Sequence, residues 1–174
     1  MRNLLVALVL LLVALGLTGC PTAYERAYTE INRVTVLTQQ VGAGNKTLTK
    51  TLLEATVADE RAKRAADMKA AGCEGQAPPT FTAPCQAVWD AAAKRYEARS
   101  RQLAAKAQAV DDAVGLTLAT LRLAVTAIGE WQAGLAGEIE WKSMLQRVLV
   151  ALGDLQRVYR EFKAFYADVK GGTP

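Results

Sequence analysis

Apolar residues recur at every seventh position along most of this chain, with polar and charged residues between them. The first row contains Ala27, Val34, Val41, Leu48, Ala55 and Ala62, and a neighbouring row contains Tyr24, Ile31 and Leu52. Heptad spacing places such residues on one face of an α-helix, whereas the buried residues of a strand alternate. The pattern predicts a long first helix, and Thr22 with Glu25 forms a capping box at its start, just after Pro21.

Two further helices are predicted downstream. The second begins after Thr82 and Pro84 and runs to about Gly134. Its two heptad rows are Trp89, Tyr96, Leu103, Val110, Thr117, Ala124 and Trp131, and Ala107, Val114, Leu121, Ile128 and Leu135. After an interruption at residues 134–137, a third helix shows alternating steps of three and four: Leu145, Val148, Leu152, Leu155, Tyr159, Phe162, Tyr166 and Val169. Gly171 and Gly172 end it.

Three amphipathic helices must bury their apolar stripes against one another. We therefore expect an all-α fold, an extended antiparallel helical hairpin or three-helix bundle with coiled-coil-like packing. The alternative is a compact four- or five-helix bundle, in which the first helix breaks at residues 42–45 and the second folds near Gly115. The extended form is favoured because Val41 and Leu48 keep the heptad register across Gly42 and Gly44.

The amino terminus carries an export signal. Arg2 precedes an aliphatic run over residues 4–15, and Leu17, Thr18 and Gly19 then lead to Cys20. This segment resembles the lipobox of bacterial lipoproteins. The resemblance implies cleavage before Cys20, a thioether-linked diacylglycerol on its sulfur, and an acyl chain such as palmitate on the new amino terminus.

An ordinary secretory signal and an uncleaved anchor are the alternatives to a lipobox. The apolar run over residues 4–17 has 14 residues, short of the roughly 20 that a spanning helix needs. We expect residues 1–19 to be the signal peptide and residues 20–174 to be a single helical domain, exported and anchored to a bacterial membrane through lipid on Cys20. Pro21 is not the aspartate associated with inner-membrane retention in enteric bacteria, which slightly favours the periplasmic face of an outer membrane if the host has two membranes.

Cys73 and Cys85 flank a segment that contains a glycine and three prolines, and that cannot continue a helix. Disulfides persist in exported proteins. We therefore predict a Cys73–Cys85 bridge that closes the loop 73–85.

Net charge and composition argue against several classes of binding and catalytic function. Cleavage removes Arg2, and the remaining 20 basic residues against 17 acidic residues give a side-chain charge of +3, too mild to indicate nucleic-acid binding. Histidine is absent, and with it the commonest general base and transition-metal ligand. Neither Ser100 nor Ser143 stands in a Ser-x-x-Lys motif. We assign no catalytic residue, metal ligand or cofactor, and expect a protein that is not an enzyme.

Basic residues flank the predicted loop on both sides: Arg61, Lys63, Arg64 and Lys69 before it, and Lys94, Arg95, Arg99, Arg101 and Lys106 after it. A hairpin that turns near Pro78 and Pro79 places residue 63 opposite about residue 94. Candidate contacts for an acidic envelope polymer or protein are Arg61, Arg64, Arg95 and Arg99. The alternative is a solvated face with i,i+4 pairs such as Glu60 with Arg64. Either way, reversing these four charges should leave the fold intact.

Three aromatic residues, Phe81, Trp141 and Phe165, fit the stripes poorly and are candidate exposed anchors for a partner. Together these features predict a non-enzymatic envelope lipoprotein, a membrane-anchored helical scaffold and interaction module of open oligomeric state. The alternatives are a carrier that holds an apolar ligand between its helices, and a phage-encoded lipoprotein that acts in exclusion or lysis.

Overall fold

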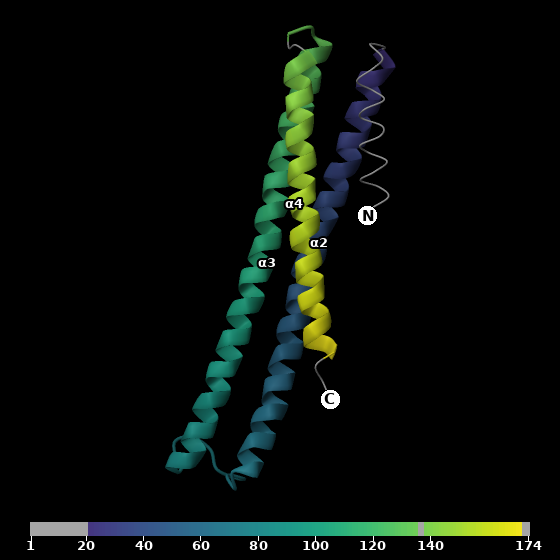
Figure 1. The fold of residues 1–174 in the computed structure, drawn as a ribbon. Coiled ribbons are helices and arrows are strands. Elements are labelled where there is room, and N and C mark those ends of the chain that lie inside the picture. The colour runs from purple at the N-terminus through teal and green to yellow at the C-terminus, as the bar shows by residue number, and fades with distance from the viewer. Residues whose placement is uncertain (1–20, 136–137, 172–174) are drawn as a thin grey trace. The chain divides into compact units, whose positions relative to one another are not determined.

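The computed structural model describes residues 21–135 and 138–171, so the predicted signal peptide and Cys20 lie outside it. Three helices make up the described chain: α2 (Pro21–Ala70), α3 (Ala83–Gln132) and α4 (Glu138–Gly171). They pack antiparallel, and the described residues form no strand (Figure 1). The all-α antiparallel fold predicted from the heptad rows is confirmed. Because α2 continues through residues 42–45 and α3 through Gly115, the compact four- or five-helix alternative is excluded.

Both interhelical connections begin with the same glycine cap. After α2, Gly72 has a φ of 70°, and the amide of Cys73 donates to the carbonyl oxygen of Met68 at 2.9 Å. After α3, Gly134 has the same φ, and the amide of Leu135 donates to the carbonyl oxygen of Glu130 at 2.8 Å. A left-handed residue that closes this bond is the Schellman motif, which glycine adopts without steric cost. The end of α3 thus lies close to the predicted Gly134, and α2 ends before the Cys73–Cys85 segment that was predicted not to be helical.

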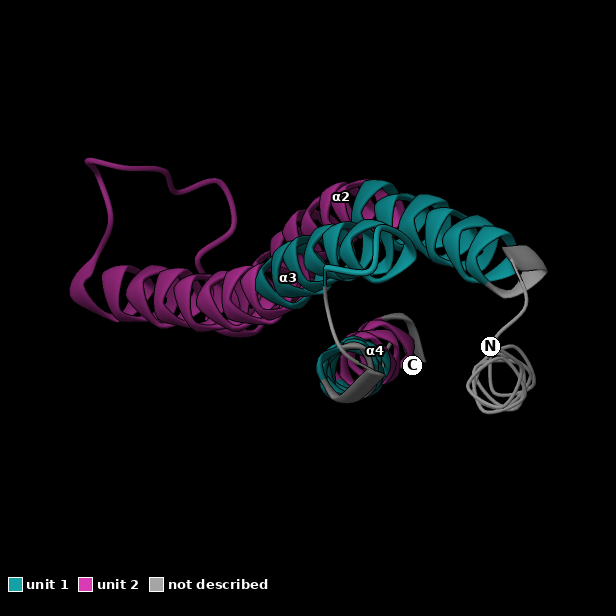
Figure 2. Ribbon diagram, turned by 90° about the horizontal axis from the view of Figure 1, so that it is seen from above, with its two compact units in different colours: residues 1–43, 112–157 teal, residues 44–111, 158–174 magenta. Residues whose placement is uncertain are grey.

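The chain divides into two compact units, which Figure 2 shows in different colours. Unit 1 comprises Met1–Ala43 and Asp112–Arg157, and unit 2 comprises Gly44–Asp111 and Val158–Pro174.

The core of unit 1 follows the predicted rows. Its buried residues are Ala27, Ile31, Val34, Leu121, Ala124, Ile128 and Val148. Tyr24 closes one end of this core against Trp131, with ring centroids 4.1 Å apart. Leu135, predicted on the same stripe, is 81% exposed because it follows the cap at Gly134, where α3 has already ended.

The core of unit 2 departs from the predicted rows toward the loop. Leu52, Leu103, Val110 and Phe162 are buried as expected. On α2, however, the next two buried positions after Leu52 are Thr56 and Glu60, whereas Ala62 is exposed. Two successive steps of four rotate the buried face of a helix away from a strict heptad row.

On α3 the predicted row also ends early. Cys85 and Ala92 are buried, Trp89 is half-buried and Tyr96 is exposed. The buried row therefore passes through residues 85 and 92, and half-buried Arg99 continues the same spacing toward its contacts with α2.

Candidate functional site

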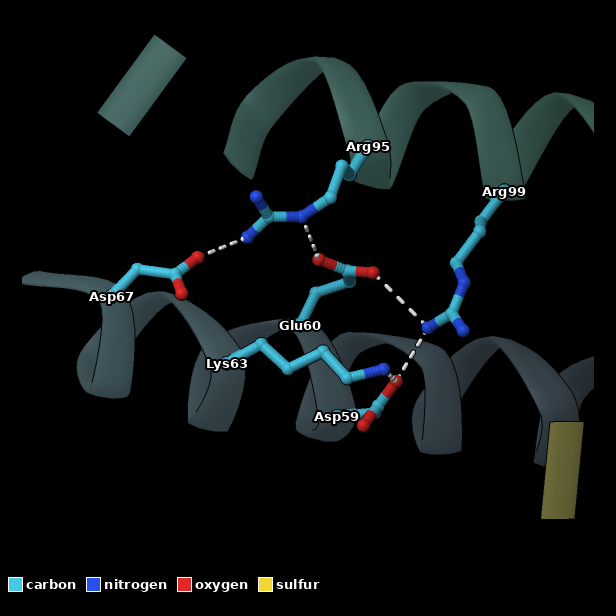
Figure 3. A network of polar contacts seen from close by, with 6 residues as sticks. All are labelled: Asp59, Glu60, Lys63, Asp67, Arg95 and Arg99. Carbon is cyan, nitrogen blue, oxygen red and sulfur yellow. Dashed lines mark hydrogen bonds and ion pairs between the residues drawn. The ribbon is translucent and has the colours of Figure 1, made fainter. Parts of the chain in front are cut away.

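Six charged side chains link α2 to α3 within unit 2, and we call them the charged cluster (Figure 3). They are Asp59, Glu60, Lys63 and Asp67 on α2, and Arg95 and Arg99 on α3. Residues four apart lie on one face of a helix, so both arginines reach toward α2. Arg95 contacts both Glu60 and Asp67, which confirms that residues near 63 lie opposite residues near 94.

Glu60 lies at the centre of the charged cluster and is 6% exposed. Its Oε1 atom accepts a hydrogen bond from Nη1 of Arg99 at 3.1 Å, and its Oε2 atom lies 3.6 Å from Nε of Arg95. A carboxylate removed from water is tolerated only when charged donors compensate it. Arg99 supplies a hydrogen bond and Arg95 the charge of an ion pair, although Oε2 of Glu60 has no hydrogen-bond partner among the described residues. The first role of both arginines is therefore internal.

Asp59 and Asp67, the other two acids of the charged cluster, also bind its basic residues. Nη2 of Arg95 binds Oδ2 of Asp67 at 2.6 Å, and Asp59 accepts hydrogen bonds from Arg99 and, at 2.9 Å, from Lys63. The bond from Lys63, followed by that from Arg99, lowers the pKa of Asp59 below its usual value. The bond to Asp67 raises the pKa of Arg95. Three acids and three bases thus balance within the charged cluster.

This balance corrects two expectations. Glu60 pairs across to α3 with Arg95 and Arg99, rather than along α2 with Arg64. The expectation that reversing Arg95 and Arg99 leaves the fold intact also changes: we now expect a loss of stability, because glutamates there would face the carboxylates of Asp59, Glu60 and Asp67. The sequence missed this because Glu60 reads as a surface residue, although its spacing of four from Thr56 places it on the buried face.

The other two candidate contacts, Arg61 and Arg64, differ from these arginines. The guanidinium carbon of Arg64 lies 4.1 Å from the centroid of the Trp89 ring, a cation–π contact. Arg61 is exposed, as is Lys94 on α3. Arg61 and Lys94 are therefore two exposed basic residues near the charged cluster that do not belong to it.

Next to the charged cluster, the predicted disulfide joins Cys73 to Cys85. Both cysteines are buried with Met68, and half-buried Phe81 packs on this group and on Trp89, with ring centroids 5.3 Å apart. Phe81 thus contributes to the packing of the loop. Phe165 is half-buried, with the Lys106 ammonium 5.6 Å from its ring centroid, and the side chain of Trp141 lies outside the described residues.

Among the described residues, no three histidine, cysteine or acidic side chains gather as a metal site would require. In the same part of the chain, α3 is the one helix long and apolar enough to cross a membrane, and 33% of its most apolar 18-residue window is buried.

No protein-family model, curated protein sequence or solved structure matches this chain.

Proposed function

We propose that this chain is a lipid-anchored, non-enzymatic scaffold of a bacterial envelope, which holds helical surfaces near the membrane for contact with another envelope protein or an acidic polymer. The observation that carries the proposal is the sequence at residues 17–20, where an apolar run ends in Leu-Thr-Gly-Cys. The described helix α2 already includes Pro21, the next residue. A flexible tether rich in glycine and serine does not separate the two, so a lipid on Cys20 would hold the helices close to the membrane surface.

Lipid attachment tests the anchor. The variant Cys20→Ser should fail to incorporate a clickable fatty acid and should leave the detergent phase, because the thioether needs the cysteine sulfur. The double variant Cys73→Ala/Cys85→Ala is the matched control, since it removes two other cysteines and keeps Cys20. Equal labelling of Cys20→Ser and the unmodified chain would refute the anchor.

Charge reversal tests the contact surface without disturbing the charged cluster. We expect Arg61→Glu/Lys94→Glu to reduce the partner recovered by crosslinking in intact cells, and recovery by the unmodified chain to fall as salt rises. The control Lys46→Glu/Lys50→Glu makes the same change of charge at two exposed positions of α2 in the same unit. Equal recovery with both variants would show that Arg61 and Lys94 are merely solvated.

A further inference from the structure

The middle of α3 presents an uncovered apolar surface in unit 1. From Val114 to Gly129 this helix carries a single charged residue, Arg122. Leu116 and Leu123, two turns apart on the same side, are 59% and 55% exposed. On α4, Val150 is 61% exposed. Large exposed apolar side chains that group on one face are typical of an interaction site.

A groove of about 480 Å³ between α3 and α4 contains part of this surface. Leu116 and Thr120 line it from α3, and Arg147, Val150, Ala151 and Asp154 from α4. The described residues give Arg147 no ion-pair partner, and Asp154 holds only a 3.3 Å contact with Nη2 of Arg157 while its side chain stays 51% exposed. The groove therefore offers an apolar centre with one charge of each sign beside it.

Two residue pairs on these helices have the same seven-residue spacing. On α4, Arg147 and Asp154 line the groove and are centred on the Val150–Ala151 bond. On α3, Leu116 lines the groove, exposed Leu123 lies beyond its lining, and the two are centred on the Ala119–Thr120 bond. The Thr117 hydroxyl donates to the carbonyl oxygen of Ala113 at 2.7 Å, and it lies 3.3 Å from that of Ala151, a contact that shows which levels of α3 and α4 are adjacent. With Thr117 level with Ala151, the midpoint on α3 and the midpoint on α4 are offset along the helix axes by about two residues. At a rise of 1.5 Å per residue, this offset is roughly 3 Å.

We infer that this α3–α4 groove binds a second copy of the same chain, which packs antiparallel about a two-fold axis through the two midpoints. Arg147 of each copy then meets Asp154 of the other, and Leu116 of each meets Leu123 of the other. An isologous interface requires such self-complementarity. A parallel pair would instead bring Arg147 of both copies to the same level and would not pair it with Asp154, so the charges favour the antiparallel arrangement.

Charge exchange tests the pairing. In native mass spectrometry of the full mature chain, Arg147→Asp should weaken the dimer about ten-fold, because each copy then sets two carboxylates against those of the other. The double variant Arg147→Asp/Asp154→Arg restores opposite charges only in the antiparallel arrangement, and should recover the dimer. Far-UV circular dichroism should be unchanged in both, since both positions are exposed.

Crosslinking in isolated envelopes tests the axis directly. Thr120 lies next to the proposed axis, so Thr120→Cys should form a dimer with a short bis-maleimide, whereas the unmodified chain and Gln40→Cys on α2 should not. Replacing Leu116 and Leu123 by asparagine in the Thr120→Cys chain should abolish that product. A monomer at all concentrations without crosslinking, or a dimer that the double exchange fails to restore, would overturn the inference. Monomers that bind phospholipid vesicles through these leucines would also overturn it.

Discussion

Asn45 donates from its side-chain amide to the main-chain carbonyl oxygen of Ala107 at 3.1 Å. The same nitrogen also donates to Oδ1 of Asp111 at 2.9 Å, and the side chain is 1% exposed. Oδ1 of Asn45 has no hydrogen-bond partner among the described residues. A buried asparagine in a helical core lowers stability but specifies register, because only one alignment satisfies its amide. Asn45 thus fixes how α2 faces α3 within unit 2.

The register role of Asn45 predicts a strong effect for an isosteric change. Asn45→Asp keeps the size of the side chain but sets a carboxylate against the carbonyl oxygen of Ala107 and the carboxylate of Asp111. We expect a loss of about 3 kcal/mol in the free energy of unfolding at pH 7, measured by urea denaturation. The loss should shrink as the pH falls from 7 and be gone near pH 4, because burial beside Asp111 raises the pKa of the new carboxyl above its unfolded value of about 3.9.

The control for this change is Asn45→Leu, which removes the polar group and keeps the bulk. Because it also removes the unpartnered oxygen, it should cost far less than Asn45→Asp, while loosening the choice of register. Equal urea midpoints for Asn45→Asp and the unmodified chain would contradict a register role for Asn45.

The disulfide supplies a second prediction. Replacing Cys73 and Cys85 together by alanine should lower the free energy of unfolding by about 3 kcal/mol, since the bridge restricts the unfolded chain. Peptide mapping by mass spectrometry without reductant should recover the linked Cys73–Cys85 peptide from envelope protein. Two free thiols in that protein would exclude the bridge.

The charged cluster predicts that superficially similar arginines differ in their effect on stability. Arg99→Gln leaves buried Glu60 without its closest charged donor and should cost about 2 kcal/mol. Arg101→Gln removes an exposed i,i+4 pair with Glu97 and should cost about 0.5 kcal/mol or less. Urea denaturation at pH 7 compares the free energies of unfolding of the two variants. Equal losses would show that the charged cluster does not help to hold α2 to α3.

The lowered pKa of Asp59 predicts how stability changes with acid. A carboxyl whose pKa is lower in the folded chain contributes stability above its unfolded pKa, and loses it as the pH falls through the folded value. The contribution of Asp59 should therefore be complete above about pH 5 and disappear below its usual value of 3.8.

Asp59→Asn should reduce the loss of stability on acidification. Urea denaturation at a series of pH values between pH 6 and pH 2 measures this as the change in the free energy of unfolding with pH. The control Asp90→Asn changes an exposed carboxylate that accepts a hydrogen bond from Gln86. This variant should lose as much stability on acidification as the unmodified chain. Identical pH profiles for both variants would show that Asp59 is not the group responsible.

The sequence predicted the helices well because apolar side chains at heptad spacing report the buried face directly. The rows through Leu103, Val110, Leu121 and Ile128 on α3 are buried as expected. Heptad spacing did not identify the buried polar residues. Thr38, Asn45 and Glu60 are buried, although polar side chains are normally expected at the surface. Their burial depends on partners on another helix, such as Ala107 for Asn45 and Arg99 for Glu60, and no pattern within one helix reveals such partners.

Gly42 and Gly44, the two central glycines of α2, allow the effect of helix propensity on stability to be distinguished from the effect of packing. A Cβ at Gly44 would meet no atom within 4 Å, so Gly44→Ala should raise the free energy of unfolding by about 1 kcal/mol. A Cβ at Gly42 would lie 3.2 Å from Cγ1 of Val114, closer than side-chain carbons normally pack. Gly42→Ala should therefore gain less than Gly44→Ala, or lose stability.

A double-mutant cycle tests this explanation, because shortening Val114 removes the atom that crowds position 42. Val114→Ala alone should cost roughly 1 to 2 kcal/mol for the lost methyl groups. Combined with Gly42→Ala it should cost less than the sum of the two single changes, with a coupling of about 0.5 kcal/mol or more. The same cycle with Gly44→Ala should be additive, since no side chain lies near that position. Additivity at position 42 as well would mean that the close approach of Gly42 to Val114 does not limit the packing of α2 on α3 in unit 1.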